Sequence, residues 1–423
     1  MKTTAPEGLG LDWRRTAAWV AGLVLLAWLA CFRFPAVWAV TGIGEANRPF
    51  MDLYGILAAC DAAKAGVDPF LPNSFDPYHR PHVYTEWWLE LGRLGLSRAD
   101  TPWLGATLLG TVLLAAMVMA RPRTRAQGMA LLLLLVSPAF LMAVNRANND
   151  LVVFVLISGG LLCFRREAWA GRALGVVLFA VSAVLKYYPL VTLVVLVELR
   201  SRRGLAAGLA LYGLVLVLAW PGLQPGLQGA ARFMSQPEWL YAFGAPVFLR
   251  NLGVTSTIGW VAPAGLMTLS AVWSAWKKAG EPAVIGSASD QAAEREFMVG
   301  AVMLAGMFFL GSSFVYKLVF AIWLLPWLWR EHADPVEARW VRAAAWLMLA
   351  VVWFEGTAAV GLNLLLGPQA LSLAMTLLKG ALLISQLLAW AWVACLLRLF
   401  FVLLGRRLMA WGPTVWPARG GRA

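Results

Sequence analysis

The sequence is poor in charge, in histidine and in cysteine. Only 13% of its 423 residues are charged, and it has 3 His and 4 Cys. A soluble globular domain carries about 25% charged residues, so the low charge excludes an ordinary soluble protein. The cysteines at 31, 60, 163 and 395 are scattered and lie mostly in apolar segments, which excludes a disulfide scaffold. The 39 Gly follow no three-residue period, which excludes a collagen-like chain.

Apolar residues, in contrast, make up 61% of the chain and gather in long runs. Several runs approach or exceed the roughly 20 residues that a helix needs to cross a bilayer. They predict an all-α fold, a polytopic membrane helix bundle that forms one integral membrane domain over residues 1–423. We expect about twelve spans, some of them short or re-entrant. They lie near 17–40, 102–120, 127–144, 150–164, 173–185, 189–199, 204–220, 254–275, 297–314, 318–329, 342–362 and 369–396.

Positive charge exceeds negative charge, with 35 Lys and Arg against 22 Asp and Glu and a net charge of +13. In a soluble protein this excess would indicate nucleic-acid binding. Here most of the cations fall in alternate connecting segments, which is the positive-inside pattern of membrane proteins. We therefore expect no nucleic-acid partner, and we expect a multi-pass protein of the cell (inner) membrane with both termini in the cytoplasm. The cationic segments are 2–15, 121–125, 165–172, 200–203, 277–295, 330–342 and 398–422.

Residues 173–199 are predicted to form a hairpin instead of one helix. Basic residues flank both ends, and one continuous helix would place the basic run 200–203 on the wrong side of the membrane. The tip of the hairpin falls at 186–189, where a proline interrupts the helical pattern. Each arm is too short to cross a hydrocarbon core of about 30 Å, so we expect both arms to be tucked into the bundle.

Two loops on the side opposite the cations are long enough to hold structure of their own. The first extracytoplasmic loop, 41–101, shows an apolar face at helical spacing over 50–66, and a second short helix is expected near 83–96. Both helices are expected to lie beside the membrane. Between them, residues 68–77 are rich in Asp, Pro and Asn and predict no regular structure. The second extracytoplasmic loop, 221–253, is expected to lie along the membrane surface.

Asp52 stands at the start of the first outer helix, just after the chain leaves the membrane. A carboxylate there can compensate the positive end of the helix dipole, which is an ordinary structural role. It can also serve as a general base that removes a proton from an acceptor hydroxyl, a task that suits a partly desolvated carboxylate. Position alone leaves both interpretations open.

The densest polar segment, 145–150, joins two apolar helices on the same side of the membrane. Its three Asn, one Arg and one Asp exceed what a short turn requires. In a structural interpretation Asp150 caps the next helix and pairs with Arg146. In a functional interpretation Arg146, Asn148, Asn149 and Asp150 form a preorganised set that binds a phosphate or a sugar, with Arg supplying a planar fork.

More cations and tyrosines are expected on this side. Lys186 and Tyr187 lie at the hairpin tip, Tyr316 and Lys317 at a later turn, and Arg250 in the second loop. A single Lys or Arg at a helix end commonly extends toward the headgroups. Several of them on one face would instead neutralise a lipid-linked phosphate or diphosphate.

A short run in the first loop, His79-Arg80 with His82, also offers groups that bind phosphate or metal. No partner carboxylate stands at a recognisable ligand spacing, so no metal ligand is assigned. Because cations can hold a departing lipid phosphate, no metal or other cofactor is required for a transfer reaction at this site.

Asp52 and Tyr54, followed by Gly66-Val67-Asp68-Pro69-Phe70, form the first of several ordered motifs. The others are 145–150, Leu185-Lys186-Tyr187-Tyr188-Pro189 and Tyr316-Lys317-Leu318-Val319-Phe320. Together they resemble the bacterial C-superfamily (GT-C) glycosyltransferases, above all family 87, the polyprenol-phosphate-mannose-dependent mannosyltransferases. The likeness covers roughly residues 15–330, and Ala147 stands where relatives often carry Gly.

The resemblance implies a multi-helix membrane enzyme with an outward active site that inverts the anomeric carbon. By the same resemblance Asp52 is the catalytic base. The expected function is transfer of a hexose, with mannose implied, from a polyprenyl-phosphate donor to a glycolipid or glycan acceptor. A multi-pass transporter or flippase of envelope precursors is the alternative, although such proteins usually show internal repeats and polar residues near the midplane. A non-catalytic partner in envelope synthesis is a third interpretation.

Overall fold

Helices make up nearly all of the structure, and the described residues contain one sheet of two short strands. The computed structural model describes the chain in segments that together cover most of its length. The prediction of an all-α membrane helix bundle is confirmed. The described residues are 12–34, 37–38, 49–166, 168–199, 201–233, 241–254, 256–279, 288–311, 313–330, 332, 334–366 and 371–410.

Each predicted span overlaps a helix or a pair of helices. The helices that begin and end the described chain are α1 (Trp13–Arg33) and α16 (Leu371–Ala410). The elements between them are α3 (Met51–Lys64), η1 (Glu86–Leu89), α4 (Glu90–Arg93), η2 (Arg98–Asp100), α5 (Thr101–Ala120), α6 (Arg125–Leu135), α7 (Pro138–Arg146), α8 (Asp150–Phe164), α9 (Trp169–Leu185), η3 (Tyr188–Leu199), α10 (Arg202–Phe233), β1 (Ala242–Phe243), α11 (Ala245–Asn251), α12 (Thr257–Ala279), α13 (Ala288–Leu310), β2 (Ser313–Phe314), η4 (Val315–Leu324), α14 (Leu325–Leu328) and α15 (Pro335–Leu366).

Four helices among the described residues are long and apolar enough to cross a membrane. α6 and α7 pass the same test as a pair, but a bend of 53° separates them. Others, such as α8 and α9, are shorter apolar helices. By this measure the described residues hold fewer full crossings than the twelve or so that the sequence predicts. The four long candidates are Trp13–Arg33, Arg98–Ala120, Arg202–Arg232 and Thr376–Met409.

The predicted hairpin at 173–199 is present, but its second arm is wound as a 3-10 helix. η3 runs for 12 residues and η4 for 10, whereas runs beyond about 4 residues are uncommon in proteins. A 3-10 helix rises about 2.0 Å per residue against about 1.5 Å in an α-helix. η3 therefore extends about 24 Å, farther than the same residues would reach as an α-helix.

Both 3-10 helices pack against α13; η4 is buried almost throughout, whereas η3 is buried on one side only. Trp323 of η4 is fully buried and stacks on Phe154 of α8 with ring centroids 5.2 Å apart. Its indole N–H donates to the hydroxyl of Ser158 at 2.9 Å. On α13, Gly300 leaves room for Leu324, whose Cδ2 lies 2.9 Å from where a Cβ would stand. These contacts place η4 firmly between α8 and α13.

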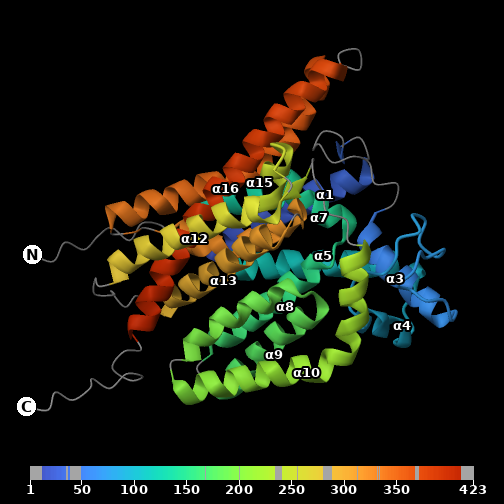
Figure 1. The fold of residues 1–423 in the computed structure, drawn as a ribbon, viewed down its shortest axis with the longest axis horizontal. Helices are drawn as coiled ribbons and strands as arrows, with labels where there is room; N and C mark the ends of the chain where they lie inside the picture. The colour runs from blue at the N-terminus through green and yellow to red at the C-terminus, as the bar shows by residue number, and fades with distance from the viewer. Residues whose placement is uncertain are drawn as a thin grey trace, which may run out of the picture.

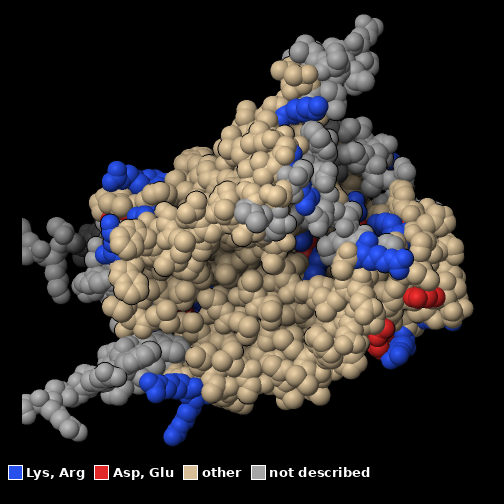
Figure 2. Space-filling view, in the orientation of Figure 1, with Lys and Arg blue, Asp and Glu red and all other residues tan. Residues whose placement is uncertain are grey.

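The helices run between two ends of the molecule that differ in composition (Figure 1). α3 and α4 lie at one end, which we call the α3 end, and the turn after α5 lies at the other, which we call the Arg121 end. Much of the surface between the two ends is uncharged (Figure 2), and the most prominent acidic side chains in this view lie over the α3 end. This distribution suits a bundle whose middle faces lipid.

The prediction that 221–253 is a surface loop is wrong for its first part. Residues 221–233 continue α10, which contains Pro221 and Pro225. Figure 1 shows α10 turning near its end to run across the α3 end of the molecule. A proline removes one backbone hydrogen bond and bends a helix without ending it when neighbouring elements support the bend. The part from 234 to 240 lies outside the described residues, and the rest forms β1 and α11.

The segment 49–101 matches its prediction in secondary structure. α3 occupies the first predicted helix, and η1 with α4 occupies the second. Residues 68–77 between them form turns without regular structure. The amide of Phe70 donates to the Asp68 carboxylate at 2.9 Å, which is the turn that Asp before proline favours.

Candidate active site at the α3 end

Asp52 is the second residue of α3, and the residue before that helix fixes its position. Phe50 adopts a left-handed conformation with φ 62°, and its N–H donates to the carbonyl of Asn145 at 2.6 Å. The Phe50 ring lies so close to Gly105 of α5 that a Cβ there would come within 2.3 Å of it. The start of α3 is therefore fastened both to the end of α7 and to α5.

The Asp52 carboxylate is buried and held by three side chains. Arg146 forms a bidentate ion pair with this carboxylate, with Nε 2.9 Å from Oδ2 and Nη2 2.7 Å from Oδ1. The amide nitrogen of Asn148 donates to Oδ2 at 2.6 Å. Arg80 approaches Oδ1 at 3.4 Å, and the Asp52 side chain is only 7% exposed. The predicted polar segment and the predicted base thus meet directly.

The surroundings of Asp52 act on its pKa in opposite directions. Burial raises the pKa, because a desolvated carboxylate is less stable when charged. Arg146, Asn148 and Arg80 lower it by charge attraction and hydrogen bonding, and together they prevail, so that the pKa lies below the ordinary value of 3.8. With these partners Asp52 is ionised at neutral pH and accepts a proton only weakly.

Arg80 is a member of the site that the sequence did not place there. Its Nε and Nη2 donate to Oδ2 of Asp76 at 3.0 and 2.8 Å, and Nη2 also donates to the carbonyl of Met51 at 2.9 Å. Asp76 in turn accepts from the backbone N–H of Tyr78 at 2.8 Å, in the turn expected of it. These contacts hold the Arg80 guanidinium group of the irregular loop beside the start of α3.

The turn after α7 carries strain at Ala147. This residue has φ 42° and caps α7 in the left-handed region, with its N–H bonded to the carbonyl of Val144 at 3.1 Å. Asn148 completes the turn by donating to the carbonyl of Ala143 at 3.2 Å. The position normally favours glycine, which has no Cβ to clash there.

Asp150 forms the second carboxylate centre at the first residue of α8. It is fully buried, pairs with the Lys186 ammonium group and accepts a hydrogen bond from the Tyr188 hydroxyl. Lys186 also donates to the side-chain oxygens of Asn149 at 2.5 Å and Asn148 at 3.4 Å. Because Asn148 also donates to Asp52, one continuous network links the two carboxylates.

The start of η4 adds Tyr316 and Lys317 to the same region. Lys317 Nζ lies 4.9 Å from the centroid of the Tyr188 ring. Tyr316 is buried and stacks on Phe314 at 5.4 Å, and Arg146 lies 5.9 Å from the Phe314 centroid. We call the assembled set the Asp52 cluster: Asp52, Arg80, Arg146, Asn148, Asn149, Asp150, Lys186, Tyr188, Tyr316 and Lys317.

Tyr187 and Arg250 are predicted site residues that the Asp52 cluster, as defined here, does not include. Tyr187 faces α10, where a Cβ at Gly226 would stand 2.6 Å from its hydroxyl. Arg250 lies on α11, a helix that packs mainly on α12, α13 and α16. Arg80 and Lys317 contribute cations to the cluster, and the role expected of Arg250 stays a prediction.

The final part of α10 covers the first loop through a face of glycines. A Cβ at Gly226 would stand 2.3 Å from the carbonyl oxygen of Tyr84, and one at Gly229 would stand 3.1 Å from that of His82. The Trp87 indole N–H donates to the carbonyl of Ala219 at 3.1 Å. This close packing holds the loop that carries Arg80 against the bundle.

His82 has a structural role in this packing. It is buried, its Nε2 lies 3.1 Å from the carbonyl oxygen of Thr85, and its ring contacts Phe70 and Tyr84 edge-on. Burial lowers the pKa of His82 to about 4, more than the hydrogen bond to Thr85 raises it. Among the described residues no group of three or more His, Cys, Asp or Glu is arranged to hold a metal ion.

The cluster combines cations, carboxylates and polar atoms with unused bonding capacity. Nδ2 of Asn149 and Oδ2 of Asp150 are buried and have no hydrogen-bond partner in the described part of the chain. Buried polar atoms are nearly always paired, so such atoms in a cation-rich site indicate groups that bind a ligand. The arrangement can neutralise an anion and place a carboxylate beside it.

Comparisons with known proteins give little beyond this geometry. No protein-family model matches the sequence, and no curated protein matches it. One solved structure, ArnT from Cupriavidus metallidurans in the apo state, aligns over 91% of this chain and 77% of that chain. The TM-score is 0.39 and the sequence identity is 17%.

Proposed function

We propose that this protein is a membrane glycosyltransferase that moves a hexose from a polyprenyl-phosphate donor to a glycolipid or glycan acceptor. The observation that carries the proposal is the Asp52 cluster, in which one network joins a buried carboxylate to cations from four separate segments. The ordered motifs that resemble family 87 supply Asp52, Arg146, Lys186 and Lys317 of this network, and Arg80 lies outside them. The resemblance supports mannose as the sugar.

The donor phosphate is the group that the cations suit. Arg146 offers a planar fork, and Lys186 and Lys317 offer compact charges nearby. As the bond between the anomeric carbon and the phosphate oxygen breaks, negative charge develops on the departing polyprenyl phosphate. Cations already in place stabilise that charge without further reorganisation.

Asp52 is the base in this proposal. The acceptor hydroxyl attacks the anomeric carbon from the face opposite the phosphate, its proton passes to Asp52, and the configuration inverts. A carboxylate paired with arginine is a weak base, so its proton affinity must rise during the reaction. If a donor phosphate takes over bonds of Arg146, that attraction weakens and burial then raises the pKa of Asp52.

The charge distribution supports an orientation for this proposal. Arg121, Arg165 and Arg330, from basic segments that the positive-inside rule assigns to the cytoplasm, line two cavities at the Arg121 end. In the proposed orientation the Asp52 cluster faces the extracytoplasmic side of the cell membrane. Donor and acceptor would then both meet the enzyme at the outer leaflet. Labelling of single introduced cysteines in intact cells tests this: residues 68–77 should react with an impermeant reagent, and residues 121–125 should not.

The function is tested by supplying membranes that contain the protein with labelled polyprenyl-phosphate sugars, mannose first and other hexoses and a pentose in parallel. Transfer of label to an extractable lipid or glycan is the expected result. Movement of labelled lipid across the bilayer without any transfer would contradict the proposal and favour the flippase alternative. Asp68→Asn is the matched control for the Asp52→Asn variant, because Asp68 lies exposed in the same loop outside the cluster.

A further inference from the structure

A cavity of about 350 Å³ opens at the Arg121 end, and none of the residues that line it belongs to the Asp52 cluster. Its volume falls in the lower part of the range for small-ligand pockets, roughly 300–1,000 Å³. Phe164 forms an apolar part of the wall, and Ser289 and Gln291 add neutral polar groups. The charged residues that line it are five arginines and one carboxylate: Arg121, Arg165, Arg166, Arg172, Arg295 and Glu198.

The positive-inside rule does not account for these arginines. That rule requires only cations near the cytoplasmic face, and solvated side chains satisfy it. Here the side chains of Arg295, Arg165 and Arg121 are only 12%, 20% and 23% exposed. Burying guanidinium groups around one cavity costs desolvation energy, which a bound anion would offset.

The carboxylates near the cavity, Glu296 and Glu198, leave some guanidinium N–H groups of the arginines without an acceptor among the described residues. Glu296 pairs with Arg165 and, at 3.4 Å, with Arg121, and Glu198 lies 3.3 Å from Nη2 of Arg295. Nε and Nη1 of Arg295 are buried without a hydrogen-bond partner in the described part of the chain.

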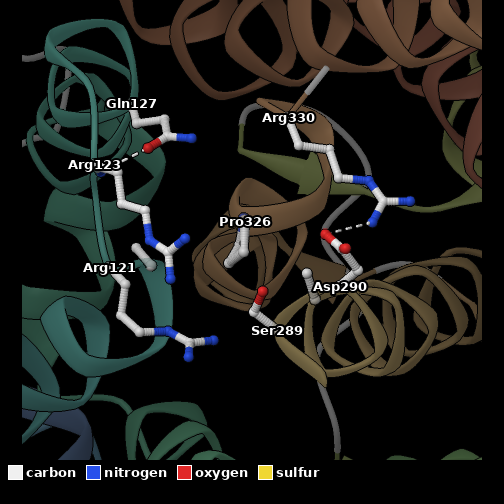
Figure 3. Close-up of a pocket in the computed structure, with 9 residues that line it drawn as sticks. Arg121, Arg123, Gln127, Ser289, Asp290, Pro326 and Arg330 are labelled. Carbon is white, nitrogen blue, oxygen red and sulfur yellow. Dashed lines mark hydrogen bonds and ion pairs between the residues drawn. The ribbon is translucent and has the colours of Figure 1, made fainter. Parts of the chain in front are cut away.

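Arg166 and Arg172 have no ion pair with any described carboxylate. They flank the turn between α8 and α9, where the base of the Arg166 side chain packs 3.3 Å from the Cβ position of Gly171. A second, smaller cavity shares Arg121 and Ser289 with the first. Figure 3 shows it with Arg121 and Arg123 on one side and Arg330, paired with Asp290, on the other. Arginine side chains therefore line both cavities, with Arg121 common to the two.

We propose that this arginine-lined cavity binds a phosphate group, either from an anionic lipid headgroup or from a soluble phosphate compound. Planar guanidinium forks match phosphate oxygens, and several of them converge here against one lining carboxylate. Arg121 follows directly on the long apolar helix α5, at the depth where lipid headgroups lie. The site is separate from the proposed transfer reaction and does not depend on it.

The test uses the full-length protein reconstituted in phosphatidylcholine with or without phosphatidylglycerol. Native mass spectrometry measures phosphatidylglycerol that stays bound after lipid exchange, and thermal unfolding in phosphatidylcholine alone, with and without pyrophosphate, measures a soluble ligand. The variant Arg166→Gln with Arg172→Gln removes two cations that hold no ion pair. The control Arg339→Gln with Arg342→Gln removes two exposed cations at the start of α15.

We expect the wild type and the control to bind the probe and the cavity variant to bind it at least tenfold more weakly, about the effect of one charged hydrogen bond. Selective loss of phosphatidylglycerol identifies a lipid headgroup, and selective loss of stabilisation by pyrophosphate identifies a soluble phosphate. Equal binding by all three proteins, or binding by none, overturns the proposal. Arg172→Lys keeps the charge, and it should bind more tightly than Arg172→Gln if the variant proteins are folded. Sugar transfer in phosphatidylcholine should be unchanged in the cavity variant.

Discussion

The two ends of the molecule each join a buried carboxylate to arginines, but they build the pair differently. At the Arg121 end, Glu296 lies within α13, and its partners Arg121 and Arg165 directly follow the ends of α5 and α8. At the α3 end, Asp52 stands in the first turn of a short helix, and its partners come from a helix end and an irregular loop.

The difference shows that an arginine–carboxylate pair is not by itself a sign of catalysis. Glu296 lies within the long helix α13, and its ion pairs connect α13 to the ends of α5 and α8. Asp52 is linked through Asn148 to Lys186 and a second carboxylate, and its own partners come from the end of α7, the turn after it and an irregular loop. In that setting a ligand can exchange partners with the carboxylate while the long helices stay in place.

Replacing Asp52 and replacing Glu296 should have different effects, the first on catalysis and the second on stability. Asp52→Asn should lower the rate of sugar transfer by about 10²–10⁴-fold, because a general base is lost. Binding of labelled polyprenyl phosphate should be retained, since the cations remain. Turnover per folded molecule and donor binding are measured in reconstituted protein. Transfer at the normal rate would show that another group is the base.

Glu296→Gln should act on stability instead. The change leaves Arg121 and Arg165 without their shared counter-ion, and breaking a buried pair in this way costs about 3 kcal/mol. Thermal and denaturant unfolding measure the loss, and transfer per folded molecule should not change. Asp290→Asn is the control, because Asp290 is 41% exposed and pairs with Arg330 at the surface. An equal loss in both variants would contradict the supporting role of Glu296.

Lowering the pH should reduce the folding stability of the protein, because His82 at the α3 end must take up a proton. The folded pKa is depressed to about 4 from an ordinary value of 6.5, so the unfolded chain binds the proton first as pH falls. Stability should therefore decline from about pH 6.5 downward, by about 2 kcal/mol at pH 5. Asp52 contributes no loss in this window, because its depressed pKa delays protonation to below pH 3.8. Unfolding of wild type and His82→Gln across pH 7 to 5 checks the slope, which should be smaller in the variant.

Ala147→Gly should stabilise the α3 end by about 1 kcal/mol, because glycine adopts the left-handed conformation without strain. The control is Ala143→Gly within α7, where the same change should destabilise by about 1 kcal/mol. Unfolding free energies of the two variants should thus move in opposite directions. A loss of stability in both would show that Ala147 is not strained.

The helices were predictable from the sequence because apolar runs and basic clusters mark their ends. The run 150–164 matches α8 residue for residue, and 102–120 differs from α5 by one residue. The extension of α10 was missed because Pro221 and Pro225 usually end a helix. Here packing of the glycine face against the first loop supports the bend, and that contact has no local signature.

The cluster was only partly predictable for a similar reason. Arg146 and Asn148 belong to a conspicuous polar segment, so the sequence singled them out. Arg80 lies among turn residues with no periodicity, and its approach to Asp52 depends on the path of the whole loop.

The winding of η3 has a mechanical consequence. Its first residue, Tyr188, is bonded to Asp150 in the Asp52 cluster, and Glu198 near its last residue pairs with Arg295 and Arg407 at the opposite end. The first end of η3 is thus bonded to one charged network, and its last turn is paired with the other. Rewinding it as an α-helix would shorten it by about 6 Å. The 3-10 winding therefore sets the distance between the two networks. A change in the winding of η3 would displace Tyr188 relative to Glu198, and so would strain the contacts that each makes.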